Sequence, residues 1–262
     1  MASYFFSWQK LPEEMWPHFA AEFRDNGAGG IVLSHACAAR LLEEPDFAGK
    51  LHGLSRVSGL GFSGAHALFG PEWDLSAIDE EHLHKQEKIL RMLPEFGVKT
   101  STIHIGLIRG SLEASRAHAL AALKYLVSCA EECGVTLCIE NAEHPGGACE
   151  ELLYYRGRIP SPALGFCFDS GHANVNGGEI PVLRKMLADI VVCHLHDNPG
   201  NMDLHMVPGD GNIPWSEVLA LLRTAPRLVS LENEANVLCS RRSYREVGEI
   251  FRKFDEEVFG GR

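Results

Sequence analysis

The feature that most constrains the fold is an alternation of short β-branched or aromatic runs with longer amphipathic stretches, repeated about eight times along 262 residues. Such alternation is typical of parallel strands joined by helical crossovers. A (β/α)₈ barrel needs about 250 residues, so one barrel would use nearly the whole chain. The expected strands are Tyr4–Trp8, Gly30–Ser34, Gly61–His66, Lys99–His104, Thr136–Glu140, Gly165–Asp169, Ile190–His194 and Leu228–Glu232.

Helical patterns lie between these runs. Pro12–Arg24 has a proline near its start and is followed by Asn-Gly, a helix stop. Ser111–Cys133 carries apolar residues at helical spacing and is closed by Gly134. The last two helices are expected over Ser216–Thr224 and Ser243–Phe259. Because no low-complexity or linker-like stretch divides the chain, the pattern predicts a single α/β TIM barrel domain over residues 1–262.

The alternative arrangement is an open, doubly wound sheet. Such sheets usually carry a glycine-rich phosphate loop after an early strand. The first two strand ends read Trp8-Gln9-Lys10 and Ser34-His35-Ala36, without such a loop. The sequence therefore favours the closed barrel.

Composition limits the partners. The net charge is −11 and no basic run exceeds the pair Arg241-Arg242, which makes nucleic acid an unlikely partner because phosphate binding draws on Lys/Arg clusters. No apolar run approaches the roughly 18–20 residues of a membrane span, and the N-terminal stretch lacks signal-peptide character. Eight cysteines without paired spacing indicate reduced thiols in a cytoplasmic protein. Homo-oligomer formation is left open.

Polar residues that could carry chemistry fall at the ends of the expected strands. In a barrel these ends converge on one face, where the active sites of this fold are found. His194 and His196 lie two apart and would face the same side of their strand. The residues are His66, His104, Glu140, Asp169 with His172, His194 with His196, and Glu232.

Taken singly, these residues have ordinary structural roles. A lone histidine at a strand end is usually a hydrogen-bonded structural residue, and a lone Glu-Asn pair is often a helix cap. Here, however, eight such groups occupy equivalent positions in six successive units. Ionised carboxylates crowded in a low-dielectric pocket raise one another's pKa unless a cation compensates. The pattern therefore predicts one or more divalent ions, and oxygen and nitrogen ligands suit Mg²⁺, Mn²⁺, Co²⁺ or Zn²⁺.

These strand-end residues resemble the xylose isomerase-like barrel superfamily, which includes sugar isomerases and epimerases as well as endonuclease IV-type DNA repair enzymes. The resemblance to the isomerase branch implies a metal held by Glu140, Asp169, His194 and Glu232. His194 is preferred over His196 because the family's His-x-x-acid pattern matches His194 to Asp197. The resemblance also implies that the two glutamates form an acid/base pair and that His172 contacts the substrate.

A second match is to the endonuclease IV branch, which holds three zinc ions. His66 and His104 match its additional ligands, and Asp203 and His205 form an Asp-x-His pair in the loop after the seventh strand. His172 completes this set, which implies a multi-zinc phosphoester hydrolase as the alternative. The acidic charge and the lack of an Arg-rich loop favour the isomerase branch.

The expected function is thus a divalent-metal-dependent isomerase or epimerase of a sugar or sugar phosphate. Proton transfer would run through a metal-stabilised enediolate, with Glu140, Glu232 and His172 as acid/base groups. A metal-dependent sugar-binding barrel without catalysis is the non-enzymatic alternative.

Two departures separate this chain from named members of the superfamily. Xylose isomerase has a lysine just after its first metal glutamate, where this chain has Asn141. The ketose 3-epimerases have a further glutamate at the position where this chain has Gly146.

Overall fold

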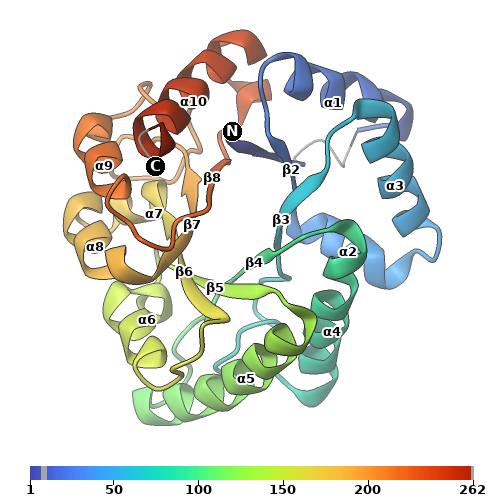
Figure 1. Cartoon of the computed structure of the whole chain (residues 1–262). Coiled ribbons are helices and arrows are strands. Elements are labelled where there is room, and N and C mark those ends of the chain that lie inside the picture. Colours follow the sequence, from blue (N-terminus) through green and yellow to red (C-terminus); the bar gives the residue numbers. More distant parts are fainter. Residues whose placement is uncertain (7–10, 261–262) are drawn as a thin grey trace.

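The computed structural model describes residues 1–6 and 11–260. Its eight strands are parallel and close into one barrel in chain order, with β1 paired to both β2 and β8 (Figure 1). The predicted (β/α)₈ barrel is therefore confirmed. The strands are β1 (Ser3–Phe5), β2 (Gly30–Leu33), β3 (Phe62–His66), β4 (Thr100–Ile103), β5 (Thr136–Glu140), β6 (Leu164–Asp169), β7 (Ile190–Leu195) and β8 (Ser230–Asn233).

The strands lie close to their expected ranges. The main difference is at the first strand, expected over Tyr4–Trp8, which ends at Phe5; residues 7 and 8 lie outside the described residues. The fourth strand ends at Ile103, so His104 follows it directly. The strand-end residues thus stand on or just beyond the same rim of the barrel.

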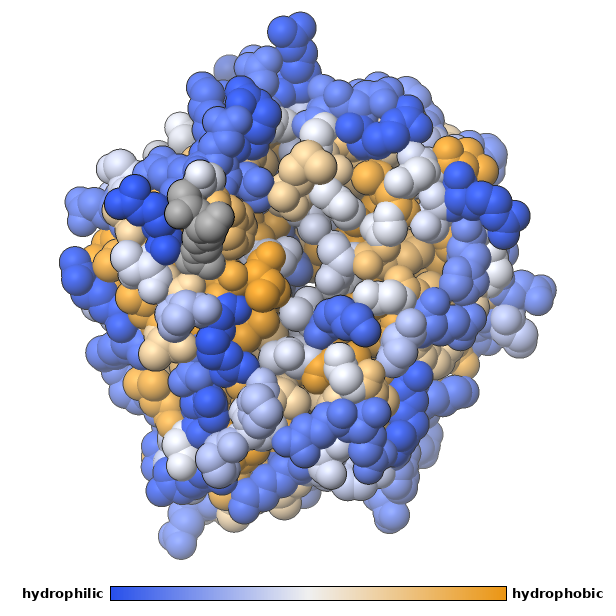
Figure 2. Space-filling view, in the orientation of Figure 1, coloured by the Kyte–Doolittle hydropathy of each residue, from blue (hydrophilic) through white to orange (hydrophobic). Residues whose placement is uncertain are grey.

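Helices surround the barrel, and space-filling colouring shows hydrophilic side chains around the periphery of the molecule (Figures 1 and 2). This is the pattern expected when helices turn their polar faces to water. Among the described residues, no helix is both long and apolar enough to cross a membrane. The helices are α1 (Trp16–Asp25), α2 (His35–Glu43), α3 (Phe47–Ser58), α4 (Glu80–Met92), α5 (Leu112–Cys133), α6 (Cys149–Arg156), α7 (Ser170–Val175), α8 (Glu179–Met186), α9 (Trp215–Leu222) and α10 (Tyr244–Phe259).

Local capping explains the ends of the two longest helices. The hydroxyl of Ser111 accepts a hydrogen bond from the Ala114 amide at the start of α5, and Gly134 ends it with φ +65°. At α10, Ser243 and Glu246 form a reciprocal capping box. These signals are local, which is why the sequence predicted both helices to within one residue.

The interior has two apolar zones. Large side chains such as Phe47, Phe166 and Phe251 are fully buried in one continuous core, whereas Cys138, Cys167, Val191 and Val192 form a small separate cluster. The Cys167 sulfur lies within 4.8 Å of ligand atoms of both Glu140 and His194. The small cluster therefore borders the polar strand ends directly.

Candidate metal and active site

Imidazole and carboxylate side chains gather where the strands end. His66, Glu140 and Asp169 are the last residues of β3, β5 and β6, and His194 is the last but one of β7. All four are buried. The structure thus brings together strand-end residues that are more than 120 positions apart in the sequence.

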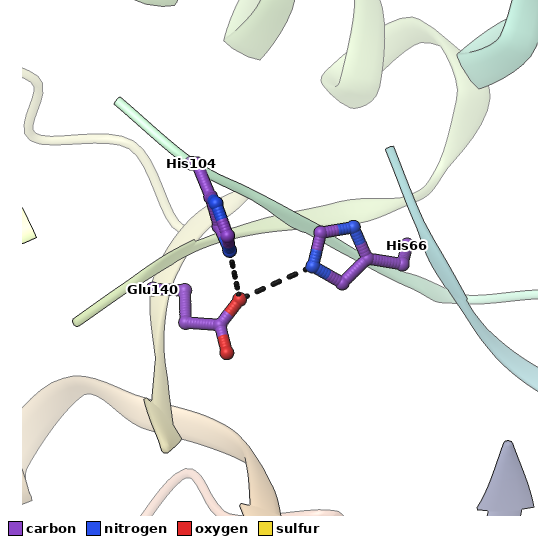
Figure 3. A group of neighbouring side chains, drawn as sticks. All are labelled: His66, His104 and Glu140. Atoms are coloured by element: carbon purple, nitrogen blue, oxygen red, sulfur yellow. Dashed lines mark hydrogen bonds and ion pairs between the residues drawn. The ribbon is translucent and has the colours of Figure 1, made fainter. Parts of the chain in front are cut away.

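Glu140 lies at the centre of this cluster. One carboxylate oxygen, Oε2, lies 2.7 Å from His104 Nε2 and 3.2 Å from His66 Nε2 (Figure 3). The other oxygen, Oε1, lies 2.7 Å from Nδ1 of His194. A single buried carboxylate therefore connects imidazoles from three different strand ends.

Two glutamates stand at the end of β8, on the same side because they are two residues apart. Glu232, the expected ligand, is the register partner of His194, and its carboxylate lies 3.4 Å from His194 Nε2. Glu234 was not anticipated from the sequence; its Oε2 lies 3.3 Å from His194 Nδ1, on the side that faces Glu140. Glu140, Asp169, His194 and Glu234 each offer a ligand atom, and these atoms all lie within 4.8 Å of one another. Glu232 is not in this group.

A second set of groups surrounds Asp169. Its Oδ1 caps α7 by accepting from the His172 amide at 2.7 Å, which explains the Asp-x-x-His spacing. Its Oδ2 lies 3.0 Å from His196 Nε2. Asp203 Oδ2 lies 3.0 Å from His205 Nε2 and 3.6 Å from His172 Nε2. This set adjoins the cluster around Glu140, because His172 Nδ1 lies 3.8 Å from Glu140 Oε1 and Asp169 Oδ2 lies 3.9 Å from His194 Nδ1.

His205 is held in a strained backbone conformation. Its φ of +47° is the only positive value among the non-glycine residues that the structure describes. Such strain persists where the surrounding structure over-determines it, often at functional sites. The imidazole stacks on His196 with ring centroids 4.0 Å apart, so the loop holds His205 against the cluster.

Asp197 anchors that loop. Its fully buried carboxylate accepts hydrogen bonds from three backbone amides, those of Asn198, Gly209 and Ile213, and from the indole N–H of Trp215. Asn198 precedes Asp203 and His205 in the chain, whereas Gly209, Ile213 and Trp215 follow them. One carboxylate therefore binds both ends of the loop that carries Asp203 and His205. Asp197 therefore has a positioning role, which the sequence pattern alone had not assigned.

The donor set fits a divalent ion. Three adjacent groups contain only imidazole and carboxylate ligands: His66–His104–Glu140, Glu140–Asp169–His194–Glu234 and His196–His205–Glu234. Among the described residues, Glu232 Oε1 is buried without a hydrogen-bond partner, and His196 Nδ1 has only the Asp203 carboxylate nearby, at 3.5 Å. Cys167 also borders the cluster, but burial raises the pKa of its thiol, which disfavours a thiolate ligand.

The charges of the metal-free cluster are strongly coupled. Burial alone would raise the pKa of Glu140, yet the nearby His194 and His104 hold it well below its usual range. Burial would lower the pKa of His172 and His205, but Asp169 and Asp203 raise these values to about 9 and about 10. Without a metal, protonated imidazoles thus supply the positive charge that the carboxylates require.

A cavity of about 390 Å³ opens above Glu140. Its lining includes His104, His172, His144 and Glu234, and its size lies in the range of roughly 300–1,000 Å³ that is usual for small-ligand sites. Gly146, which stands where ketose 3-epimerases carry a glutamate, has no room for a side chain, because a Cβ there would lie 1.9 Å from the Gly106 carbonyl oxygen.

Comparisons with known proteins identify the family of this barrel. The model of the family described as xylose isomerase-like TIM barrel matches residues 20–252. An uncharacterised protein of Methanocaldococcus jannaschii is 35% identical over 43% of this chain, and a D-psicose 3-epimerase of Enterocloster bolteae is 30% identical over 44%. The matches span only 41% and 38% of those two relatives.

Solved structures resemble the whole chain. A D-tagatose 3-epimerase-like protein superposes with a TM-score of 0.78 at 22% identity, covering 100% of this chain and 99% of its own. The IolI protein with a bound zinc atom gives a TM-score of 0.74 at 17% identity, again covering 100% and 99%. At such identities the likeness concerns the fold.

The raised pKa values predict how the metal-free protein responds to pH. A histidine whose pKa rises on folding contributes stability that is complete below its unfolded value of 6.5 and is lost as pH rises through its folded value. After chelation, the melting temperature should therefore fall between about pH 6.5 and about pH 10, as His172 and His205 lose their protons. His205→Asn, which tolerates positive φ, should flatten this fall, whereas exposed His18→Asn should not. Identical pH profiles for all three proteins would contradict the prediction.

The two glutamates of β8 should differ in their effect on metal affinity. We expect Glu234→Gln to weaken zinc binding at least about tenfold more than Glu232→Gln, because only Glu234 belongs to the four-residue group. Competition with a chromophoric chelator measures both affinities. The reverse ranking would assign the ligand to Glu232, as first expected from the sequence.

Proposed function

Because the chain belongs to the xylose isomerase-like TIM barrel family, we propose that it is a divalent-metal-dependent isomerase or epimerase of a sugar. The observation that carries the proposal is the group formed by Glu140, Asp169, His194 and Glu234, at the floor of a cavity of sugar size. The epimerases among the similar proteins support the reaction class. The zinc atom in the IolI protein supports the metal.

The bound ion would supply Lewis-acid stabilisation of the negative charge that develops on adjacent substrate oxygens. Glu140 and Glu234 both line the cavity, and we assign them the removal and return of the proton on the carbon between those oxygens. His172, which also lines the cavity, is the alternative proton donor. Glu232 does not line this cavity or an adjoining cavity of about 540 Å³. We therefore assign it a supporting role beside His194 in place of the acid/base role expected from the sequence.

His144 would orient a substrate hydroxyl. Its Nδ1 accepts a hydrogen bond from the Gly147 amide at 3.1 Å, so the proton of the neutral ring resides on Nε2. Burial lowers the pKa of His144, which keeps the ring neutral. The residue thus offers a single N–H donor at the wall of the cavity.

The multi-zinc hydrolase remains the second candidate, and one specific observation favours it. The three imidazole–carboxylate groups are adjacent, since Glu140 is shared by two of them and Glu234 by two. Two-metal hydrolases use ions about 3.5–4 Å apart, which requires shared carboxylates of this kind. We prefer the isomerase because it needs only the central group.

Proton transfer predicts isotope exchange. With a panel of ketoses, aldoses and keto-glycosides in D₂O, the metal-loaded protein should place deuterium on the carbon next to the carbonyl, which NMR detects. Glu234→Gln should abolish the exchange, since an amide cannot act as a base. Exposed Glu150→Gln is the control and should exchange normally. A metal-loaded protein that binds a sugar of the panel without any exchange would instead indicate the non-catalytic sugar-binding barrel.

Metal stoichiometry separates isomerase from hydrolase. Elemental analysis of protein purified without chelator should show one tightly bound ion per chain, and His104→Ala should retain it while weakening substrate binding. In the hydrolase, two or three ions would be present and His104→Ala would lose one of them together with turnover. Exposed His84→Ala serves as the control in both measurements.

A further inference from the structure

A second cavity adjoins the one above Glu140. Its volume is about 540 Å³, and it shares five lining residues with the first. The two cavities therefore meet at Glu234, a member of the group Glu140–Asp169–His194–Glu234, hereafter the metal group. A ligand that lies at Glu234 would border both cavities. The shared residues are His66, Phe69, Asp203, His205 and Glu234.

The second cavity has a different chemical character from the first. Beyond the shared residues, the first continues with titratable residues such as His104, Glu140 and His172. The second continues mostly with uncharged residues, among which Ser34, Asn233 and Asn236 are polar, and with one further titratable residue, His35. Phe5, the last residue of β1, and Tyr244, the first residue of α10, both line it. The second cavity, hereafter the apolar cavity, is lined in addition by Leu204, Val237 and Leu238.

Three of its apolar side chains are unusually exposed. Phe69, Leu204 and Leu238 are 41%, 47% and 51% exposed, and they come from the loops after β3, β7 and β8. Exposed apolar surface that is gathered at one place and rimmed by polar residues marks a binding groove. Because three separate loops bring exposed apolar side chains to one cavity, its lining favours an apolar occupant.

The charged groups of the apolar cavity favour an uncharged occupant. Among the described residues that line it, the charged groups are Asp203 and Glu234 together with the histidines His35, His66 and His205, and none is a lysine or arginine. A phosphorylated group would lie beside two carboxylates without a permanently positive partner. An uncharged, apolar occupant matches both the walls and the charge.

We propose that the substrate is an unphosphorylated sugar with an apolar substituent, an alkyl or aryl glycoside whose aglycone fills the apolar cavity while the sugar lies at the metal group. This proposal rests on the proposed function. Continuity with the metal group favours a substituent of the substrate over a separate partner protein, because His66 and Glu234 line both cavities. Since a glycosidic bond blocks the anomeric carbonyl, the reacting carbonyl must lie on another ring carbon, next to the carbon that loses its proton.

Binding of unreactive glycosides tests the aglycone site without turnover. By calorimetry on the zinc-loaded protein, phenyl β-glucoside should bind about tenfold or more tightly than methyl β-glucoside, because the phenyl group buries apolar area. Leu238→Asn and Leu204→Asn should remove most of this preference, because they should weaken binding of phenyl glucoside far more than binding of methyl glucoside. Val229→Asn changes an exposed apolar residue before β8 that does not line the cavity, and this control should retain the preference.

Each contrary result has a distinct meaning. Equal affinity for the two glucosides, or a preference that both loop variants retain, would overturn the proposal, as would phenol binding as tightly as phenyl glucoside. A dimer that Leu238→Asn dissociates, without any aglycone preference, would assign the apolar cavity to a second copy of the chain. If deuterium exchange on sugars is observed but the aglycone preference is absent, the proposed function stands and this inference fails. A preference without exchange supports the aglycone site while the proposed function fails.

Discussion

The structure depends on one constraint, the burial of several carboxylates in the mouth of the barrel. An isolated buried carboxylate is strongly destabilising, so each must be paired with positive charge or hydrogen-bond donors. Glu140 is surrounded by His66, His104 and His194, and Asp169 by His172 and His196. Both carboxylates therefore carry their charge inside the protein only because the strand ends supply imidazoles around them.

This constraint extends into the barrel wall and the loops. At Gly64 on β3, a Cβ would lie 2.6 Å from the carboxylate of Glu232, so the glycine makes room for an acidic side chain inside the barrel. At Asp197 the compensation is different, since backbone amides and an indole N–H satisfy the charge. Gly64 thus leaves space for the Glu232 side chain beneath the site. The hydrogen bonds of Asp197 hold the loop that brings Asp203 and His205 to the site. Folding of the site is thus inseparable from folding of the barrel end.

The fold and most of the polar cluster were predictable because both are encoded locally. Strand-forming runs and helix caps are short-range patterns, and the closure of parallel strands forces their ends together. Glu234 was missed because it follows the expected strand Leu228–Glu232, although its spacing of two from Glu232 would have revealed it. Where each carboxylate points, by contrast, depends on packing around His194 that no single strand specifies. The apolar cavity was not predictable either, since its walls come from loops without a common sequence pattern.

Proton transfer and stable burial of charge place opposite demands on a carboxylate, and the position of Glu234 between the two cavities meets both. Proton transfer requires a carboxylate that reaches the substrate, whereas stable burial of charge requires that it be enclosed. Glu140 is enclosed almost completely, with 1% of its side chain exposed, while the side chain of Glu234 is 20% exposed and borders both cavities. Water and substrate can therefore reach Glu234 more readily than Glu140. An apolar group that filled the apolar cavity would displace water from one side of Glu234. The lower local polarity would strengthen the electrostatic interactions of this carboxylate with the metal group. In the arrangement that we propose, the occupant of the apolar cavity would contribute to the chemistry at Glu234 as well as to affinity.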